Sequence, residues 1–494
     1  MSGPVWRSPF LAEKRGTLKK IVSRLSDRFG WASILGTDAE GLAYEVTGKG
    51  YSVRESRWSE RGFVVRVFID GRCFEHAFDS LPGSDPSGSD PSGSDPSGSD
   101  AAAAADRIAA AIERMAGAAR GGIPARRFSA MPMTEEPLVM ERFADAADDP
   151  VTRDPGEIFA VMKEINDETS NASPAIANCR VRYEGVRLGK LYLSPAREQE
   201  QSMIWSQGYI FLILRKGDRN KFMYRNYSGL KGPSLLEEVR AGIGTAVKEG
   251  LMILDAGKLE PGEYDVIFSP DVAGIIAHEA FGHGVETDMF VRGRALASDY
   301  LGKRVGSEKG GMKDGAKSVA HVASYFFDDE GTPAGDTVII DKGILKGGIS
   351  DTLSAVILGM PRTGNGRRES FDRKAYARMT NTFFTPGTDT LDEMIASTTH
   401  GYFIDRALSG MEDPKNWGIQ VVALIGREIR DGSFTGAVVS PVVLTGCVPD
   451  VLSAVTAVSG KVDCSGSGYC GKGHKEYVKV SSGGPYMKMR MRLG

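Results

Sequence analysis

The spacing of apolar residues changes along the chain and predicts different elements in different segments. Residues 18–29 place apolar side chains at helical intervals, which is typical of an amphipathic helix. Alternating apolar and polar positions follow and predict half-buried strands. These strands are expected at residues 32–35, 43–46, 62–69 and 72–77.

Three further helices are predicted before residue 260. The alanine-rich stretch 101–120 has a strong intrinsic helix propensity. Asp154 precedes Pro155, and an acidic cap followed by proline is typical of a helix start. The third helix is expected from Ser234 to about Met252. Strand-like runs between the last two helices cover residues 175–183, 188–193 and 202–214.

From Tyr264 onward the pattern becomes rich in short strands. One short helix is expected from Asp271, as its cap, to Gly282. Apolar runs then alternate with Gly, Asp and Asn turns, and hairpins are expected at residues 337–346 and 421–432. We therefore predict an α+β protein, with an α/β N-terminal part followed by a β-rich C-terminal domain that carries one embedded helix.

A compositional break supports a division into domains. Residues 82–100 read PGSDPSGSDPSGSDPSGSD and contain no apolar side chain to bury, which indicates a flexible surface insertion. The predicted division is an α/β subdomain at 1–81, the insertion at 82–100, a middle α/β region at 101–235 and a β-rich domain at 236–494.

Charge and composition exclude several function classes. Lys+Arg total 61 and Asp+Glu 64, a net charge of -3, so no basic field favours nucleic acid as the main partner. The N-terminus lacks the apolar core of a secretory signal, and no apolar stretch reaches the ~18 residues of a membrane span. Five scattered cysteines argue against a disulfide framework. We expect a soluble, cytoplasmic protein.

The candidate chemistry lies on the embedded helix, which reads His278-Glu279-x-x-x-His283. Two imidazoles can hold a zinc ion, and a carboxylate beside them can take a proton from the nucleophilic water. The alternative is that both histidines are hydrogen-bonded structural residues, because short motifs produce false positives. The pattern thus indicates a metal-binding helix with Glu279 as general base.

The spacing of this motif is unusual for a helix. Positions i and i+4 are ~40° apart around a regular helix, but i and i+5 are ~140° apart. Either a π-type turn or a helix end at Gly282 must therefore bring His283 back toward His278. Gly282 and Gly284 flank His283 and should lower the strain of that departure.

A catalytic zinc site needs a third protein ligand. A thiolate in the glycine-dense segment 465–474 is one option, since glycines let the backbone enter a tight site, but a lone cysteine is often simply buried. A thiolate ligand would favour zinc over manganese. The candidates are Glu286, Asp288, His321, Cys447, Cys464, Cys470 and His474.

Polar residues downstream are candidates for binding the substrate and its oxyanion. Arg368, Arg378 and Asn381 lie in two polar segments of the β-rich part. A donor to the oxyanion is typically worth ~2.7–4 kcal/mol of transition-state stabilisation. The alternative is that the arginines form ordinary salt bridges, which are common and individually weak.

Several segments resemble one metallopeptidase family. HEAFGHGVETD, DDEGTPAGDTVIIDKGILKGGISD, RRESFDRKAYARMTNTFFTPG and GYCGKGH resemble the TldD/PmbA family, and specifically its catalytic TldD-like branch, most strongly over residues 260–480. The resemblance implies a zinc site of His278, His283 and Cys470 with Glu279 as base. It also implies a homodimer, or a heterodimer with a PmbA/TldE-like chain, that acts on small unfolded proteins or peptides.

Three function classes follow from these observations. The first is a zinc peptidase in which Glu279 activates the zinc-bound water. The second is a non-catalytic partner subunit or peptide-binding regulator of a related protease complex, and the third is a metal-dependent hydrolase of another amide. Glu279 beside His278 favours the first class, because a non-catalytic chain has no need of the base.

Overall fold

The N-terminal region is built on one eight-stranded sheet. The computed structural model describes residues 5–81, 98–120, 135–472 and 475–494. The strand order is β4-β3-β1-β6-β7-β5, with β2 paired to β1 and β8 paired to β7. The strands are β1 (Ala32–Thr47), β2 (Gly50–Glu55), β3 (Glu60–Ile69), β4 (Arg72–Phe78), β5 (Leu138–Arg142), β6 (Ile176–Leu193), β7 (Arg197–Lys216) and β8 (Arg219–Gly229).

Strands from both sides of the Ser/Gly/Asp/Pro repeat share this sheet. β1 pairs with β6 antiparallel from Ile34↔Leu193 to Thr47↔Arg180, so the segments 1–81 and 101–235 contribute to a single sheet. Residues 82–97 of the predicted insertion lie outside the described residues. Residues 98–100, at its end, already belong to a helix.

Two groups of helices cover the sheet. The first group packs mainly on β1, β6 and β4 through one apolar core, and the second packs mainly on β6, β7 and β8 through another. Asp154 caps its helix as predicted, accepting the Gly156 N–H at 2.7 Å. The helices are α1 (Pro9–Phe29) and α2 (Gly98–Arg120) in the first group, and α3 (Pro155–Asn171), α4 (Leu235–Ala241) and α5 (Ile243–Leu254) in the second.

The helix expected from Ser234 to Met252 is divided at Gly242. A Cβ at this position would lie 1.5 Å from the Tyr227 hydroxyl, so only glycine allows α4 and α5 to approach β8 this closely. Both helices therefore pack on the N-terminal sheet, although apart from Leu235 they lie within the segment 236–494.

The C-terminal region contains a seven-stranded sheet that closes on itself. Its order is β16-β9-β25-β19-β17-β18, with β20 paired to β25. Because β16 also pairs with β17 over most of its length, β16, β9, β25, β19 and β17 form a ring. The strands are β9 (Gly262–Phe268), β16 (His400–Asp413), β17 (Gly418–Arg430), β18 (Ser433–Val439), β19 (Val442–Cys447), β20 (Val455–Val458) and β25 (Met487–Leu493).

A second sheet of six strands faces the other side of the embedded helix, with the order β12-β11-β10-β15-β24-β21. Its β11–β12 pair confirms the hairpin predicted at residues 337–346. Its strands are β10 (Met312–Asp314), β11 (Thr337–Asp341), β12 (Ile344–Leu345), β15 (Asn381–Phe384), β21 (Asp463–Ser465) and β24 (Ser481–Gly484).

Short hairpins and helices complete this region. The hairpins are β13 (Gly366–Arg367) with β14 (Tyr376–Ala377), and β22 (Tyr469–Lys472) with β23 (Lys475–Lys479). The helices are α7 (Thr287–Val291), α8 (Thr352–Leu358), α9 (Leu391–Ala396) and α10 (Val448–Ser453).

The embedded helix α6 (Pro270–Ile276) packs against both β24 and β16. Its residues Val272, Ala273 and Ile276 are buried in the core of the C-terminal region. A Cβ on Gly274 would lie 2.6 Å from the Gly483 nitrogen, so the helix rests directly on the β24 backbone. This contact fixes where the C-terminal end of α6 points.

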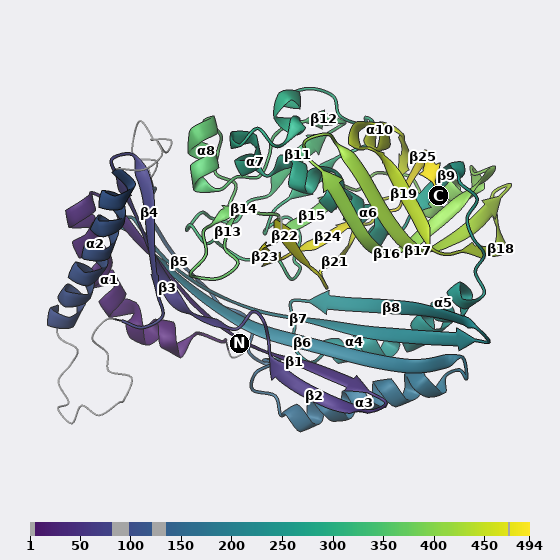
Figure 1. The fold of residues 1–494 in the computed structure, drawn as a ribbon, viewed down its shortest axis with the longest axis horizontal. Helices are drawn as coiled ribbons and strands as arrows, with labels where there is room; N and C mark the ends of the chain where they lie inside the picture. The colour runs from purple at the N-terminus through teal and green to yellow at the C-terminus, as the bar shows by residue number, and fades with distance from the viewer. Residues whose placement is uncertain (1–4, 82–97, 121–134, 473–474) are drawn as a thin grey trace.

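The long N-terminal sheet extends alongside the C-terminal region (Figure 1), and polar contacts join the two. Arg66 on β3 pairs with Glu330, and Lys190 on β6 pairs with Asp329. Gln201 on β7 donates to the Phe327 carbonyl at 2.8 Å. The predicted α+β class with a β-rich C-terminal part is confirmed. None of the helices within the described ranges is long and apolar enough to cross a membrane.

Candidate metal centre

The helix that carries the histidine motif ends in a π-helical turn. α6 is followed by a π turn at Ala277–Gly282, after which the His283 N–H bonds to the His278 carbonyl. An i→i+5 bond of this kind brings residues five positions apart onto one side. The rings of His278 and His283 lie 5.1 Å apart at an interplanar angle of 88°. Of the two predicted alternatives, a π-type turn or a helix end at Gly282, the structure shows the π turn.

The glycines around His283 are required for close approach. Gly282 has ordinary right-handed dihedrals, φ -60° and ψ -57°, so it does not relieve backbone strain as expected. A Cβ on Gly282 would instead lie 2.1 Å from the Met379 sulfur, and one on Gly284 would lie 2.9 Å from Glu412 Oε1. The absence of side chains lets the π turn pack against both neighbours.

Cys470 reaches the histidines from the C-terminal end of the chain. It lies on β22, opposite Val478 on β23. Its Sγ is 3.2 Å from His283 Nε2. One ligand atom each from His278, His283 and Cys470 lies within 4.8 Å of the other two, so the structure brings together the three residues that the resemblance implies.

Burial and charge act in opposition on these side chains. Burial alone would raise the pKa of the Cys470 thiol, but positive charge on His283 and His278 outweighs it and holds that pKa well below its usual range. Burial disfavours protonated His283, yet the Cys470 and Glu286 charges raise the His283 pKa well above its usual value. The arrangement therefore favours a thiolate, the form in which cysteine binds metals.

Arg378 and Glu286 enclose the three candidate ligands on one side. Glu286 Oε2 is 3.2 Å from His283 Nδ1, and Glu286 Oε1 accepts from Arg378 Nε at 3.1 Å. Arg378 Nη2 donates to the Cys470 carbonyl at 3.0 Å and lies 3.1 Å from its Sγ. Although burial opposes it, the nearby charges of Lys472 and His283 lower the pKa of Glu286.

Glu279 follows His278 in the π turn and is partly exposed. Its Cγ lies against β16, where a Cβ on Gly410 would come within 2.5 Å of it. Glu412 lies two residues further along β16, and its burial raises the pKa of its carboxyl well above the usual value. No pattern in the sequence indicated Glu412. Its strand, β16, comes to lie beside the helix only when the seven-stranded sheet forms.

The other third-ligand candidates have different surroundings. Glu286 contacts His283, one of the candidate ligands, and Asp288 pairs with Lys472 at 2.6 Å. His321 packs against Gly466, Cys464 against Gly483, and Cys447 is exposed. His474 lies outside the described residues.

The three candidate substrate-binding residues make extensive internal contacts. Arg368 pairs with Glu75 on β4. Asn381 is buried and donates to the Val319 carbonyl and the Ser324 hydroxyl, each at 3.0 Å. Arg378 faces Cys470 and Glu286, as described above. A role of these residues in substrate binding stays a prediction.

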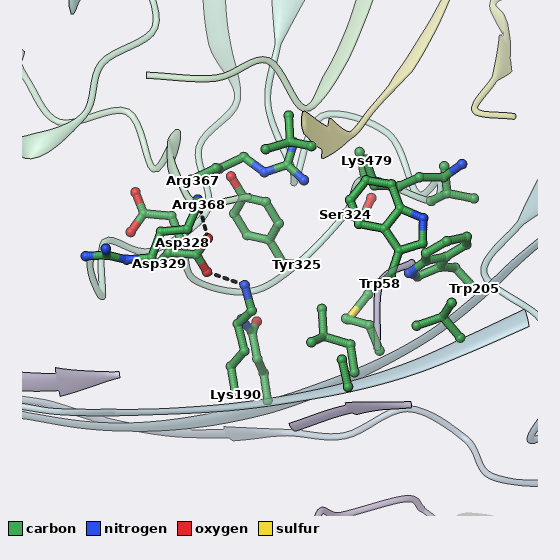
Figure 2. Close-up of a pocket in the computed structure, with 18 of the residues that line it drawn as sticks. Trp58, Lys190, Trp205, Ser324, Tyr325, Asp328, Asp329, Arg367, Arg368 and Lys479 are labelled. Atoms are coloured by element: carbon green, nitrogen blue, oxygen red, sulfur yellow. Dashed lines mark hydrogen bonds and ion pairs between the residues drawn. The ribbon is translucent and has the colours of Figure 1, made fainter. Parts of the chain in front are cut away.

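A cavity lies between the N-terminal sheet and the C-terminal region (Figure 2). Trp58, Trp205 and Lys479 line one end, and the Lys190–Asp329 ion pair lines the other. Burial lowers the pKa of Lys479 to about 7. Lys479 lies on β23, so the cavity adjoins the hairpin that carries Cys470. No single sequence segment could reveal this cavity, because its walls come from distant strands.

Residues 261–492 match the PmbA/TldA metallopeptidase C-terminal domain. This region belongs to the TldD/PmbA family. The chain's similarity to a metalloprotease of Methanothermobacter thermautotrophicus extends over both regions, with 26% identity over 96% of this chain and 97% of the relative.

Other relatives match this chain over shorter stretches. A metalloprotease of Methanocaldococcus jannaschii is 36% identical over 48% of this chain and 52% of its own length, so the match spans about half of that relative. A zinc metalloprotease TldD homolog of Saccharolobus solfataricus is 27% identical over 67% of this chain and 74% of the homolog.

A solved structure shares the fold of this chain. TldE from Thermococcus kodakarensis superposes with a TM-score of 0.71 at 17% identity, covering 97% of this chain and 100% of the TldE chain. At this identity the similarity shows a shared fold only. The shared fold includes both the N-terminal sheet and the C-terminal region.

Proposed function

We propose that this chain is a zinc-dependent peptidase that hydrolyses peptide bonds in unfolded or small peptides and proteins. The proposal rests on one observation: His278, His283 and Cys470 converge, and Glu279 directly follows the first of them. Relatives named metalloprotease, and one named zinc metalloprotease, support it.

The three side chains fit a zinc ion by their chemistry and spacing. Two imidazoles and one thiolate are ligands that zinc prefers, and three protein ligands leave a position open for catalysis. Ligand atoms around one tetrahedral zinc lie about 3.5 Å apart. The three atoms here lie within 4.8 Å of one another, so small side-chain shifts would bring them onto one ion.

The reaction would use Glu279 as its proton carrier. A bound zinc would polarise the scissile carbonyl and lower the pKa of its water to about 7. Glu279 is partly exposed beside His278, where its carboxylate would take the proton of the attacking water and pass it to the leaving amine. β16 supports this role sterically, because close packing at Gly410 restricts the Glu279 side chain.

Substrate and assembly belong to the same proposal. Substrates would enter as extended chains, which can pair with a strand edge. The protein would act as a homodimer or as a heterodimer with a PmbA/TldE-like chain, as the family resemblance implies. Light scattering of the protein alone and with such a partner tests this, and a monomer in both samples contradicts it.

Metal content and peptide cleavage, measured together, test the peptidase. The wild type should contain about one zinc per chain and cleave an unfolded peptide. His283→Ala should lose the metal, because two ligands hold zinc poorly. Glu279→Gln should keep zinc and cleave roughly 10²–10⁴-fold more slowly, the usual contribution of a positioned acid–base group.

Each alternative has its own result. Cleavage at the wild-type rate by Glu279→Gln would rule out its role as base, and an active wild type without metal would rule out the site. A zinc-loaded wild type that cleaves no peptide would favour the non-catalytic partner subunit. Cleavage of small amides in preference to peptides would favour another amide hydrolase.

A further inference from the structure

Arg378 is the point at which separate segments of the metal centre meet. It follows β14 directly, and its side chain is fully buried. Its Nε donates to Glu286 beyond the π turn at 3.1 Å, and its Nη2 donates to the Cys470 carbonyl on β22 at 3.0 Å. Its Nη1 donates to the carbonyl of Glu476 on β23. One guanidinium thus joins the segment that follows the π turn to both strands of the β22–β23 hairpin, which carries Cys470.

Glu286 extends this connection to a metal ligand. Its Oε2 is 3.2 Å from His283 Nδ1, while His283 Nε2 faces Cys470 Sγ at 3.2 Å. A carboxylate on one imidazole nitrogen fixes the tautomer that presents the other nitrogen to a metal. Arg378 contacts the second ligand directly, with Nη2 3.1 Å from Cys470 Sγ.

We propose that Arg378 and Glu286 form a positioning pair, which sets the spacing between His283 and Cys470 and tunes how strongly the Cys470 sulfur donates electrons to a bound metal. This inference rests on the proposed zinc site and adds a role for two residues that are not ligands. It gives Arg378 a function at the metal centre in addition to the predicted substrate contact.

The positions of Arg378 and Glu286 explain how they would act on His283 and Cys470. His283 and Cys470 are 187 positions apart in the sequence, so only contacts across the fold can hold their spacing. An N–H donated to a thiolate withdraws charge from the sulfur, and burial strengthens that bond. The planar fork of arginine reaches Glu286 and Cys470 together, whereas a lysine ammonium is a single point charge.

Lys472 keeps the test variants interpretable. Its Nζ lies 3.1 Å from Glu286 and 2.6 Å from Asp288. If Arg378 is replaced, Glu286 therefore retains a cation, and the buried carboxylate is not left without a partner. Arg66 is a matched control, because it is also buried between two carboxylates, Glu75 and Glu330, on the N-terminal sheet side.

Cobalt-loaded protein provides a readout that does not depend on activity. Absorption reports the energy of the sulfur-to-cobalt charge-transfer band, and competition with a chromophoric chelator reports metal affinity. Arg378→Lys should move the band to lower energy and weaken binding ~10–100-fold, the usual effect of losing an outer-shell contact. Glu286→Gln should weaken binding with a smaller band shift, since the sulfur keeps Arg378. Arg66→Lys should leave band and affinity unchanged.

The results separate positioning from general stability. A folded Arg378→Lys protein with wild-type band and affinity overturns the inference, as does an equal shift in Arg66→Lys. If Arg378→Lys does not fold, the metal affinity of Glu286→Gln provides the test. A wild-type affinity in Glu286→Gln then overturns the inference. A wild type without the band also overturns it, because Cys470 is then no ligand. A wild type with the band but no peptide cleavage contradicts only the proposed peptidase.

Discussion

Buried charges at the metal centre occur in matched sets. Lys472 lies close to both Glu286 and Asp288, and the Cys470 sulfur lies close to His283 and Arg378. Removing one partner of a buried pair costs ~3–5 kcal/mol, because the other charge is left uncompensated. For each substitution here, the metal affinity and the free energy of unfolding should therefore both be measured.

Replacing Gly282 by alanine tests the close packing of the π turn. Its Cβ would lie 2.1 Å from the Met379 sulfur, and overpacking of this kind typically costs ~1–3 kcal/mol. Gly282→Ala should lower the free energy of unfolding in urea by that amount and weaken zinc binding. Gly244→Ala on α5, where nothing lies within 4 Å, should be neutral or stabilise by up to ~1 kcal/mol. Equal stability of Gly282→Ala and wild type would contradict the packing argument.

At the scale of elements, two helices begin in different ways. α3 begins after Asp154, whose side chain caps it as predicted. α6 begins after Ser269, and the expectation that Asp271 is its cap is wrong. Asp271 instead accepts the Ala407 N–H on β16 at 3.0 Å. This bond ties α6, the helix that leads into the histidine motif, to the strand that carries Glu412.

The cap of α3 can be measured by itself. Asp154→Ala should lower the free energy of unfolding by about 1 kcal/mol, because the Gly156 N–H loses its acceptor. Asp167→Ala on the same helix removes only an exposed pair with Lys163, which should cost less than ~0.5 kcal/mol. Urea unfolding of both variants checks this, and equal losses would show that Asp154 has no capping role.

At the scale of the whole molecule, the two regions meet through buried polar groups. Arg66 pairs with Glu330 across the boundary. Glu60, at the start of β3, accepts the N–H of Phe371, 311 residues away, at 2.8 Å. Because such groups are partly removed from water, the stability of the contact between the two regions depends on whether they are protonated.

Glu60 makes that sensitivity measurable. Burial raises the pKa of its carboxyl to about 7. Because the folded-state pKa lies above the unfolded one, its stabilising contribution is complete below about pH 4.5 and is lost as pH rises through about 7. Relative to Glu60→Gln, the wild type should lose about 2 kcal/mol of unfolding free energy between about pH 5 and pH 8. Urea unfolding at both pH values tests this, and parallel losses in the two proteins would refute it.

Local sequence patterns predicted where strands occur better than where each strand begins and ends. Residues 32–35 and 43–46 were predicted as two strands, yet they are one strand, β1, that passes through Gly36 and Gly41. Leu11 and Phe63 pack against Gly36, and Val186 packs against Gly41, so these glycines serve packing and do not end the strand. β24, Ser481–Gly484, was missed because it has no apolar pattern, although it supports α6.

The sequence by itself determined the candidate chemistry and the need for an irregular helix at the histidine motif, while the structure showed that the irregularity is a π turn. An i, i+5 pair of histidines cannot share one side of a regular helix, and that steric fact is local. The residue pattern alone left the third ligand open among residues from Glu286 to His474, and only the family resemblance favoured Cys470. Only the tertiary structure placed Cys470 beside His283 and surrounded both with Arg378 and Glu286. These contacts join segments far apart in the chain, and their spacing depends on the packing of whole sheets, which no local pattern encodes.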